Sequence, residues 1–203
     1  MFITLEGGDG VGKSTQARML ADALRRAGHD VLLTREPGGT PGAEALRQII
    51  LSPKHVWSDL ASTFLHFAAR AEHVADAIRP ALAAGACVVC DRFADSTVAY
   101  QGYGEGIDLG TIATLTAMIG LRPDLTLVLV ADPATSAARI ALRPPRDDRY
   151  EELGAAFNRR IDQGFRSIVA AEPDRCVLID ANGTPDEVHA TIWAAATARL
   201  PAP

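Results

Sequence analysis

The feature that most constrains this chain is a glycine-rich loop near its N-terminus. Residues 7–14 read GGDGVGKS, which matches the phosphate-loop pattern G-x-x-x-x-G-K-[ST]. The loop follows a predicted strand at residues 2–6 and opens a predicted helix at residues 13–27, which is the context the pattern requires. Glycines let successive backbone N–H groups converge on an anion, and the helix adds the positive end of its dipole. The loop therefore predicts an α/β fold that binds the phosphates of a nucleotide.

The pattern also assigns roles to single side chains. Lys13 is predicted to reach the β- and γ-phosphates, and the Ser14 hydroxyl to ligate Mg²⁺. Asp91 ends an apolar run that reads as a strand, so its carboxylate is the second candidate for Mg²⁺, directly or through water. A capping or ion-paired aspartate is the alternative reading of Asp91. The predicted ATP site is Gly7, Gly8, Asp9, Gly10, Val11, Gly12, Lys13, Ser14 and Thr15.

Apolar runs and helical periods alternate along the rest of the chain. Further strands are predicted at residues 30–34, 86–90, 125–130 and 175–180. The second and third of these are continuously apolar, which is typical of parallel strands covered on both faces. Asp59 is predicted to cap a long helix, and Thr184 with Glu187 has the spacing of a capping box. The succession predicts a single domain over residues 1–203 with three layers and a mainly parallel five-stranded sheet.

Two segments are predicted to be mobile. Residues 102–106 contain three glycines, and residues 143–149 contain two prolines and three arginines, Arg143, Arg146 and Arg149. The second segment is a candidate lid, around residues 142–150, that closes over the phosphates. A solvated charged turn is the alternative.

Composition excludes several classes of protein. With 20 Lys+Arg against 25 Asp+Glu the net charge is -5, which disfavours a dedicated nucleic-acid binder. The apolar run at residues 125–131 is far shorter than the ~20 residues of a membrane-spanning helix, and residues 1–6 are too short and too acidic for a signal peptide. Cys87 and Cys90 lie three apart on a predicted strand, so their thiols face opposite sides and are expected to be inert. We therefore expect a cytoplasmic protein with neither nucleic acid nor membrane as partner.

A phosphate loop alone does not separate a motor or partitioning ATPase, a switch GTPase and a small-molecule kinase. Neither asparagine is followed by lysine, so the Asn-Lys-x-Asp motif of guanine-reading switches is missing from the sequence. Transfer between two polyanions requires several cations across the cleft, and the chain offers Arg35, Arg47, Arg70 and Arg92. These arginines favour a small-molecule kinase, although any one of them alone would more often be a surface residue.

Five segments carry a resemblance to a known family. They read FITLEGGDG (2–10), TREPGGT (34–40), FAAR (67–70), DRF (91–93) and AYQG (99–102). The first is shared with many kinases, whereas the other four, in this order, are specific to thymidylate kinases of the bacterial type. The resemblance runs nearly end to end. It implies the P-loop nucleoside monophosphate kinase fold, Mg²⁺ with ATP as phosphoryl donor, dTMP as substrate, dTDP as product for dTTP biosynthesis, and a homodimer.

The resemblance also implies the dTMP site: Glu36, Pro37, Arg47, His66, Phe67, Arg70, Arg92, Thr97, Tyr100 and Gln101. Arg70 is expected to hydrogen-bond the thymine edge with Thr97 and Gln101 as polar companions, and Tyr100 to lie under the deoxyribose. Arg92 is expected to grip phosphate at the transfer point, while Glu36, Pro37 and Arg47 form the substrate-side wall.

Two departures from the family pattern carry expectations of their own. The family usually places a phenylalanine four residues before the base-reading arginine, but this chain has His66 there and Phe67 next to it, so either ring is a candidate to stack on thymine, with His66 favoured. Neither Gly10 nor Val11 is basic, and family members lacking a basic residue in that loop supply it from the lid. The implied catalytic residues are Asp9, Lys13, Arg92, Arg146 and Arg149. Another nucleoside or nucleotide kinase, and a P-loop ATPase switch, remain the alternative functions.

Overall fold

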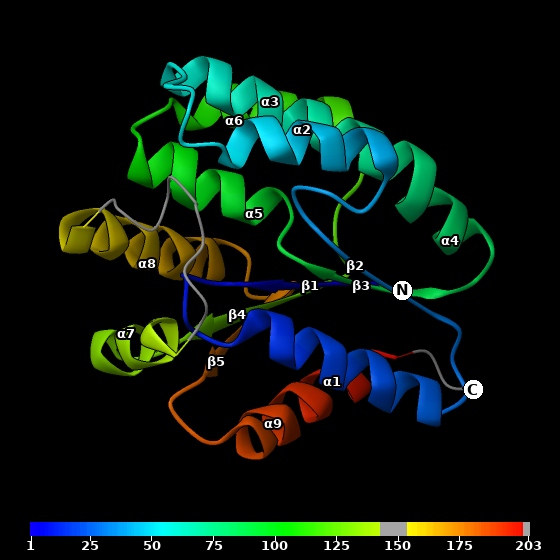
Figure 1. Cartoon of the computed structure of the whole chain (residues 1–203). Coiled ribbons are helices and arrows are strands. Elements are labelled where there is room, and N and C mark those ends of the chain that lie inside the picture. The colour runs from blue at the N-terminus through cyan, green and yellow to red at the C-terminus, as the bar shows by residue number, and fades with distance from the viewer. Residues whose placement is uncertain (143–153, 201–203) are drawn as a thin grey trace.

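The computed structural model describes residues 1–142 and 154–200 of the chain. Within these residues five strands form one parallel sheet, and helices cover both of its faces (Figure 1). The strands are β1 (Phe2–Glu6), β2 (Val31–Arg35), β3 (Cys87–Asp91), β4 (Leu125–Val130) and β5 (Cys176–Asp180). The helices are α1 (Lys13–Arg26), α2 (Pro41–Leu51), α3 (Asp59–His73), η1 (Val74–Ile78), α4 (Arg79–Ala83), α5 (Ala94–Thr97), η2 (Val98–Gly104), α6 (Leu109–Ile119), α7 (Pro133–Ala141), α8 (Gly154–Ala171) and α9 (Pro185–Thr197).

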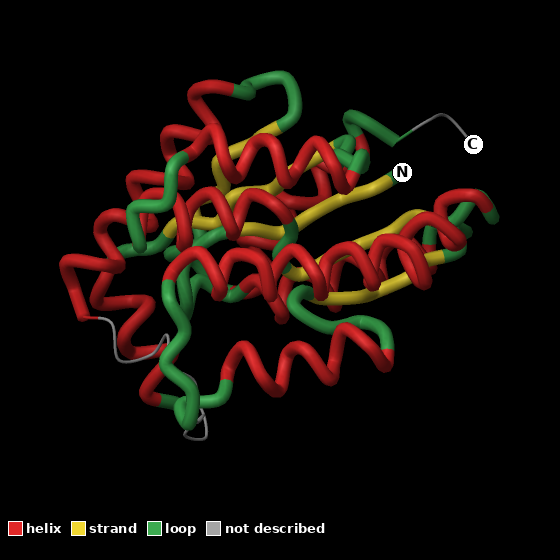
Figure 2. Tube along the Cα trace, turned by 90° about the horizontal axis from the view of Figure 1, so that it is seen from above, coloured by secondary structure: helices red, strands yellow, loops and turns green. Residues whose placement is uncertain are grey.

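The strand order β2-β3-β1-β4-β5 places the carboxyl ends of three strands side by side. Each pair is parallel, with Leu5 opposite Asp91 and Arg35 opposite Asp91 in the register. The loops after β1, β2 and β3 therefore meet at one edge of the sheet, where ligands bind in open α/β folds. Seen from above, the helices run alongside the strands (Figure 2). The predicted three-layer fold with a parallel five-stranded sheet is confirmed.

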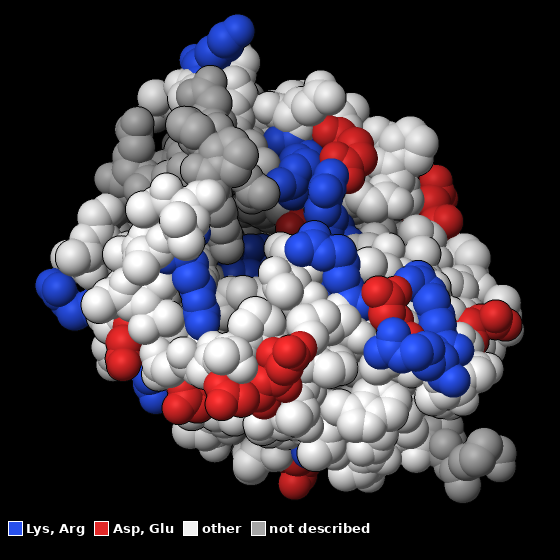
Figure 3. Space-filling model, turned by 60° about the horizontal axis from the view of Figure 1, so that its bottom comes forward, with Lys and Arg blue, Asp and Glu red and all other residues white. Residues whose placement is uncertain are grey.

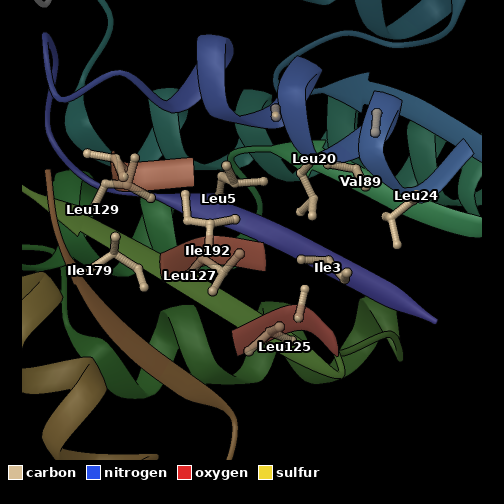
Figure 4. Close-up of a cluster of buried hydrophobic side chains, with 14 of the residues drawn as sticks. Ile3, Leu5, Leu20, Leu24, Val89, Leu125, Leu127, Leu129, Ile179 and Ile192 are labelled. Carbon is tan, nitrogen blue, oxygen red and sulfur yellow. The ribbon is translucent and has the colours of Figure 1, made fainter. Parts of the chain in front are cut away.

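The two faces of the sheet bury separate cores. On one face, alternate β1 residues Ile3 and Leu5 pack with Leu20 and Leu24 of α1 and with Ile192 of α9 (Figure 4). On the other face, the strand residues that alternate with these, among them Phe2 and Val88, pack against η1 and α4. Cys87 belongs to the first core and Cys90 to the second, and both thiols are buried and free. The prediction that these thiols face opposite sides of a strand is confirmed.

The structure corrects two local predictions. Asp59 does not cap α3: the cap position is Ser58, and Asp59 is the first helical residue, where its charge still complements the helix dipole. The glycines of residues 102–106 do not form a loose segment, because Val98–Gly104 is a π-helix and a Cβ built on Gly104 would lie 2.7 Å from the ring of Phe157. Gly104 therefore permits close packing against α8, and Gly102 permits close packing against Leu109 of α6. The capping box of Thr184 and Glu187 is present as predicted.

None of the helices in the described part of the chain has both the length and the apolar character needed to cross a membrane.

Candidate active site

The phosphate loop is the turn between β1 and α1, at the carboxyl end of the central strand. Gly7, Gly10 and Gly12 have φ values of 134°, 82° and 99°, a backbone region that residues other than glycine rarely adopt. A Cβ built on Gly10 would lie 2.4 Å from the backbone oxygen of Ser136, so the loop is also fitted against α7. The predicted ATP residues thus lie in one strand–loop–helix unit.

Lys13 and Asp9 place opposite charges in this loop. The Lys13 ammonium is almost fully buried and donates to the carbonyl of Gly8. Burial, together with the charge of Arg92, lowers the pKa of Lys13 to about 8. Burial alone would raise the pKa of Asp9, but the charges of Arg92 and Lys13 outweigh it and hold that pKa at about 2. Lys13 is therefore cationic and Asp9 anionic at neutral pH.

Arg92 connects the loop after β3 to the phosphate loop. Its φ of 72° is left-handed, which costs a residue other than glycine about 1–2 kcal/mol, and such strain clusters at functional sites. The guanidinium donates to the carbonyl of Gly7 at 3.1 Å and to the hydroxyl of Ser96 at 3.1 Å. It also donates to the carboxylate of Asp9 at 2.7 Å and to the hydroxyl of Tyr100 at 3.0 Å. These bonds fix Arg92 at the mouth of the phosphate loop.

Glu6, which sequence reasoning missed, holds the segment after β3 from inside the protein. Its carboxyl group is fully buried and accepts hydrogen bonds from the backbone N–H of Phe93 at 2.7 Å and the hydroxyl of Ser96 at 2.6 Å. Burial, with the nearby charge of Asp95, raises the pKa of Glu6 to about 8. Because Ser96 also accepts a hydrogen bond from Arg92, Glu6 supports Arg92 through a single hydroxyl.

Ser14 and Asp91 come together as the phosphate-loop pattern requires. The Ser14 hydroxyl donates to the Asp91 carboxylate, although 77 residues separate them in the chain. A hydroxyl and a carboxylate beside a phosphate loop fit Mg²⁺, which proteins usually hold with one or two oxygen ligands while substrate phosphates supply others. The juxtaposition brings the two predicted metal ligands within reach of one ion.

A second polar cluster lies around Arg70 of α3. Its Nε donates to Glu36 at 2.8 Å, and its Nη2 donates to the Phe93 carbonyl at 3.0 Å and the Thr97 hydroxyl at 3.1 Å. Its Nη1 is buried and has no hydrogen-bond partner among residues 1–142 and 154–200. Burying a guanidinium nitrogen without a hydrogen-bond partner costs free energy of folding, so this atom is a donor that a ligand carrying an acceptor would satisfy.

One cleft of about 670 Å³ joins the phosphate loop to the Arg70 cluster. Figure 3 shows Lys and Arg side chains gathered around a hollow in the molecular surface. The lining includes these predicted site residues: Asp9, Gly10, Lys13, Ser14, Glu36, Pro37, Arg47, His66, Arg70, Asp91, Arg92, Thr97, Tyr100 and Gln101. Arg35 also lines it and pairs with Glu44 at 3.1 Å. One cleft therefore has cationic side chains that suit phosphate groups at the phosphate loop, and polar side chains that suit a nucleotide base around Arg70. Such a cleft is suited to two substrates.

The structure separates the two candidate stacking rings. His66 lines the cleft, whereas Phe67 is buried with the guanidinium carbon of Arg70 4.9 Å from its ring centroid. Arg47 is held against the substrate-side wall, where its Nη1 donates to the Pro37 carbonyl at 2.6 Å.

Further residues at the site carry no local signal in the sequence. His73, fully buried on α3, contacts Glu36, and Arg139 of α7 donates to the Val11 carbonyl of the phosphate loop at 3.5 Å and to the Ala181 carbonyl at 2.8 Å. Their contacts join residues far apart in the chain, so spacing could not have found them. The expected lid arginines Arg143, Arg146 and Arg149 lie outside the described residues.

The fold and this cleft define the class: a phosphate-loop kinase of the nucleoside monophosphate kinase fold. Residues 5–192 match the family model for thymidylate kinase, and the chain belongs to the thymidylate kinase family. It is 51% identical to a thymidylate kinase of Synechococcus sp. (strain JA-2-3B'a(2-13)), over 99% of this chain and 96% of that protein. It is 50% identical to one of Gluconobacter oxydans (strain 621H), over 95% and 92%. The crystal structure of the Ehrlichia chaffeensis thymidylate kinase superposes with a TM-score of 0.82 at 33% identity, covering 97% of this chain and 98% of that one.

Proposed function

We propose that this member of the thymidylate kinase family carries out the family's reaction, transfer of the γ-phosphoryl group of ATP to dTMP to give dTDP and ADP, in the cleft described above. In this proposal ATP lies on residues 7–15, and dTMP lies across from it with its base toward α3. The strand order supports it, because the loops after β1, β2 and β3 meet at this edge.

The unpartnered Nη1 of Arg70 is the observation that carries the base site. Glu36, Phe93 and Thr97 hold the other nitrogens of the guanidinium, so the remaining donor has a fixed direction. A carbonyl oxygen on the thymine edge is the acceptor it lacks. Gln101 and Thr97 line the same part of the cleft as polar companions, and His66 is the ring proposed to stack on the base.

Phosphoryl transfer in this cleft needs positioning and charge neutralisation rather than a protein base. The acceptor oxygen of dTMP is already anionic, so no proton has to be removed to make it a nucleophile. Lys13 and Arg92 supply fixed cations on the two sides of the transfer point, and Asp9 orients Arg92 and Tyr100 by accepting a hydrogen bond from each, at 2.7 Å and 2.9 Å. Ser14 and Asp91 would hold Mg²⁺, which would supply further positive charge to the phosphates.

The proposal has three further features. The lid of residues 142–150, with Arg146 or Arg149 entering the site, rests on the sequence alone. A homodimer is supported by two large apolar side chains on α3 and α6, two helices that contact each other. The exposed fraction of the residue is 50% for Phe64 and 77% for Met118. A cytoplasmic place of action fits three cysteines that are free and buried.

The substitution Arg70→Ala tests the base site. Loss of a hydrogen bond from a charged donor is worth about 1.5–3 kcal/mol, so kcat/KM for dTMP should fall about 10- to 100-fold while KM for ATP stays near its parent value. Arg166→Ala, which removes an exposed arginine paired with Asp162 on α8, is the matched control and should change neither. Equal losses for dTMP and ATP in Arg70→Ala would assign Arg70 a structural role.

A further inference from the structure

Behind Arg70 lies a buried chain of polar contacts that sequence reasoning did not reveal. His73, one helical turn after Arg70 on α3, is 0% exposed. Its Nδ1 lies 3.1 Å from Glu36 Oε1, and its Nε2 lies 2.7 Å from Thr34 Oγ1. Because a carboxylate paired with an arginine only accepts hydrogen bonds, Nδ1 carries the proton in this contact. The contacts therefore run from Thr34 through His73 and Glu36 to Arg70.

The imidazole ring is held in place by the chain around it. A Cβ built on Gly39, whose φ is 92°, would lie 2.4 Å from His73 Nε2 and 2.5 Å from Thr34 Oγ1. The backbone after β2 thus packs directly on the ring, and only glycine fits there. With Thr34 at one nitrogen and Glu36 at the other, the ring has little freedom to turn.

His73 determines which atoms of Glu36 are available to Arg70. Oε1 faces His73 Nδ1, and the hydrogen bond between Arg70 and Glu36 runs from Nε to Oε2, at 2.8 Å. Carboxylates otherwise tend to grip a guanidinium with both oxygens, here at Nε and Nη2. Such a grip would draw Nη2 from the Phe93 carbonyl and the Thr97 hydroxyl and would rotate Nη1 out of its present direction.

We propose that His73 is a positioning residue for base selection: by holding Glu36 to a single hydrogen bond with Arg70, it keeps Arg70 Nη1 directed at the C4 carbonyl of thymine. This inference deepens the proposed function and rests on it. His73 does not touch the nucleotide; it acts through Glu36. Its loss therefore specifically weakens the recognition of a base with a carbonyl group at C4.

Three variants separate the two nitrogens of the ring. His73→Phe keeps a ring and removes both polar contacts. His73→Asn places an amide nitrogen where Nδ1 lies and keeps the bond to Glu36, whereas His73→Gln places its amide nearer Thr34. Val74→Ala is the matched control, because Val74 is the buried neighbour of His73 in the chain and is the first residue of η1, where it packs in the core that contains Phe2 and Val88.

The readout is the dissociation constant of dTMP, of dCMP and of ADP for each folded variant, measured by titration calorimetry with melting temperature alongside. dCMP keeps the C2 carbonyl but carries an amino group at C4, where dTMP has its second carbonyl. In His73→Phe and His73→Gln the affinity for dTMP should fall about ten-fold, with dCMP and ADP within two-fold of the parent, so that the preference for dTMP collapses. His73→Asn should stay near the parent, and Val74→Ala should lower the melting temperature without changing the preference.

Two results would overturn the proposal. If dTMP, dCMP and ADP affinities fall together in His73→Phe, the residue is structural; if His73→Asn loses as much preference as His73→Gln, the contact with Glu36 is not the one that matters. Should His73→Phe not fold, the comparison of Asn with Gln decides alone. A parent protein that does not prefer dTMP over dCMP would instead contradict the base site itself, before His73 is considered.

Discussion

Gly8 and Gly10 occupy variable positions of the phosphate-loop pattern, yet the structure distinguishes them. Apart from its two chain neighbours, no described residue has an atom within 4 Å of a Cβ built on Gly8, and the φ of Gly8 is outside the left-handed region. Gly10 has a φ of 82°, and its Cβ would meet the backbone oxygen of Ser136 at 2.4 Å. We therefore expect Gly8→Ala to be tolerated and Gly10→Ala to disable the loop.

The size of the effect follows from the geometry. An ordinary contact for such a Cβ begins at 3.4 Å, so the phosphate loop or α7 must move by about 1 Å to admit the Gly10→Ala methyl group. Both partners are backbone, so no side chain can turn aside. A misplacement of about 1 Å in a catalytic site can cost about 10²-fold in rate, which is the fall in kcat/KM for ATP that we expect. The left-handed conformation adds a loss of about 1–2 kcal/mol in the free energy of unfolding.

A coupled assay of ADP release, with dTMP saturating and ATP varied, measures the rate effect, and urea denaturation measures the stability effect. Gly8→Ala, in the same loop, controls for the added methyl group. If Gly10→Ala keeps kcat/KM within a few-fold of Gly8→Ala, the close approach of the loop to α7 does not exist in the working enzyme and the reasoning fails.

Three further predictions concern charged groups. Lys13→Ala should lower kcat by orders of magnitude with the melting temperature retained, since Lys13 stabilises charge on the transferred group; turnover within a few-fold of the parent would contradict this. The pKa of Glu6 is raised from 4.5 to about 8, so its protonated carboxyl stabilises the folded state fully below pH 4.5, and this contribution is lost as pH rises through about 8. Glu6→Gln should remove this decline in the free energy of unfolding with rising pH, and an unchanged pH profile would refute the prediction. Among Arg143→Ala, Arg146→Ala and Arg149→Ala at least one, Arg149→Ala foremost, should lose up to about 10³-fold in kcat with little change in dTMP affinity, whereas a solvated turn would leave all three active.

Most of the fold was accessible from the sequence because its signals are local. The phosphate loop, the continuous apolar strands and the capping box of Thr184 and Glu187 each depend on neighbouring residues, and the structure has all of them. The cap at Asp59 was wrong by one residue, since serine and aspartate at adjacent positions are both good caps. The glycines of residues 102–106 were misread because glycine signals close packing as well as mobility.

The candidate site was accessible where a motif names residues and inaccessible where contacts are long-range. Lys13, Asp91 and Arg92 were named by pattern or resemblance. Glu6 and His73 were not named in this way. Glu6 bonds the backbone of a residue 87 positions away, and His73 bonds Glu36 on a different element. Contacts of this kind produce no pattern of spacing in the sequence. The roles of these two residues follow only from the strand order that brings β1, β2 and β3 together.

The most direct test of the central claim is the formation of ADP with a panel of acceptors, dTMP, dUMP, dCMP, dAMP and dGMP, and with no acceptor, at one concentration of Mg²⁺ and ATP. The account predicts that dTMP is converted to dTDP far faster than any other monophosphate is phosphorylated, and that ADP is not released without an acceptor. ADP release that continues without acceptor, or a purine monophosphate preferred over dTMP, would contradict it.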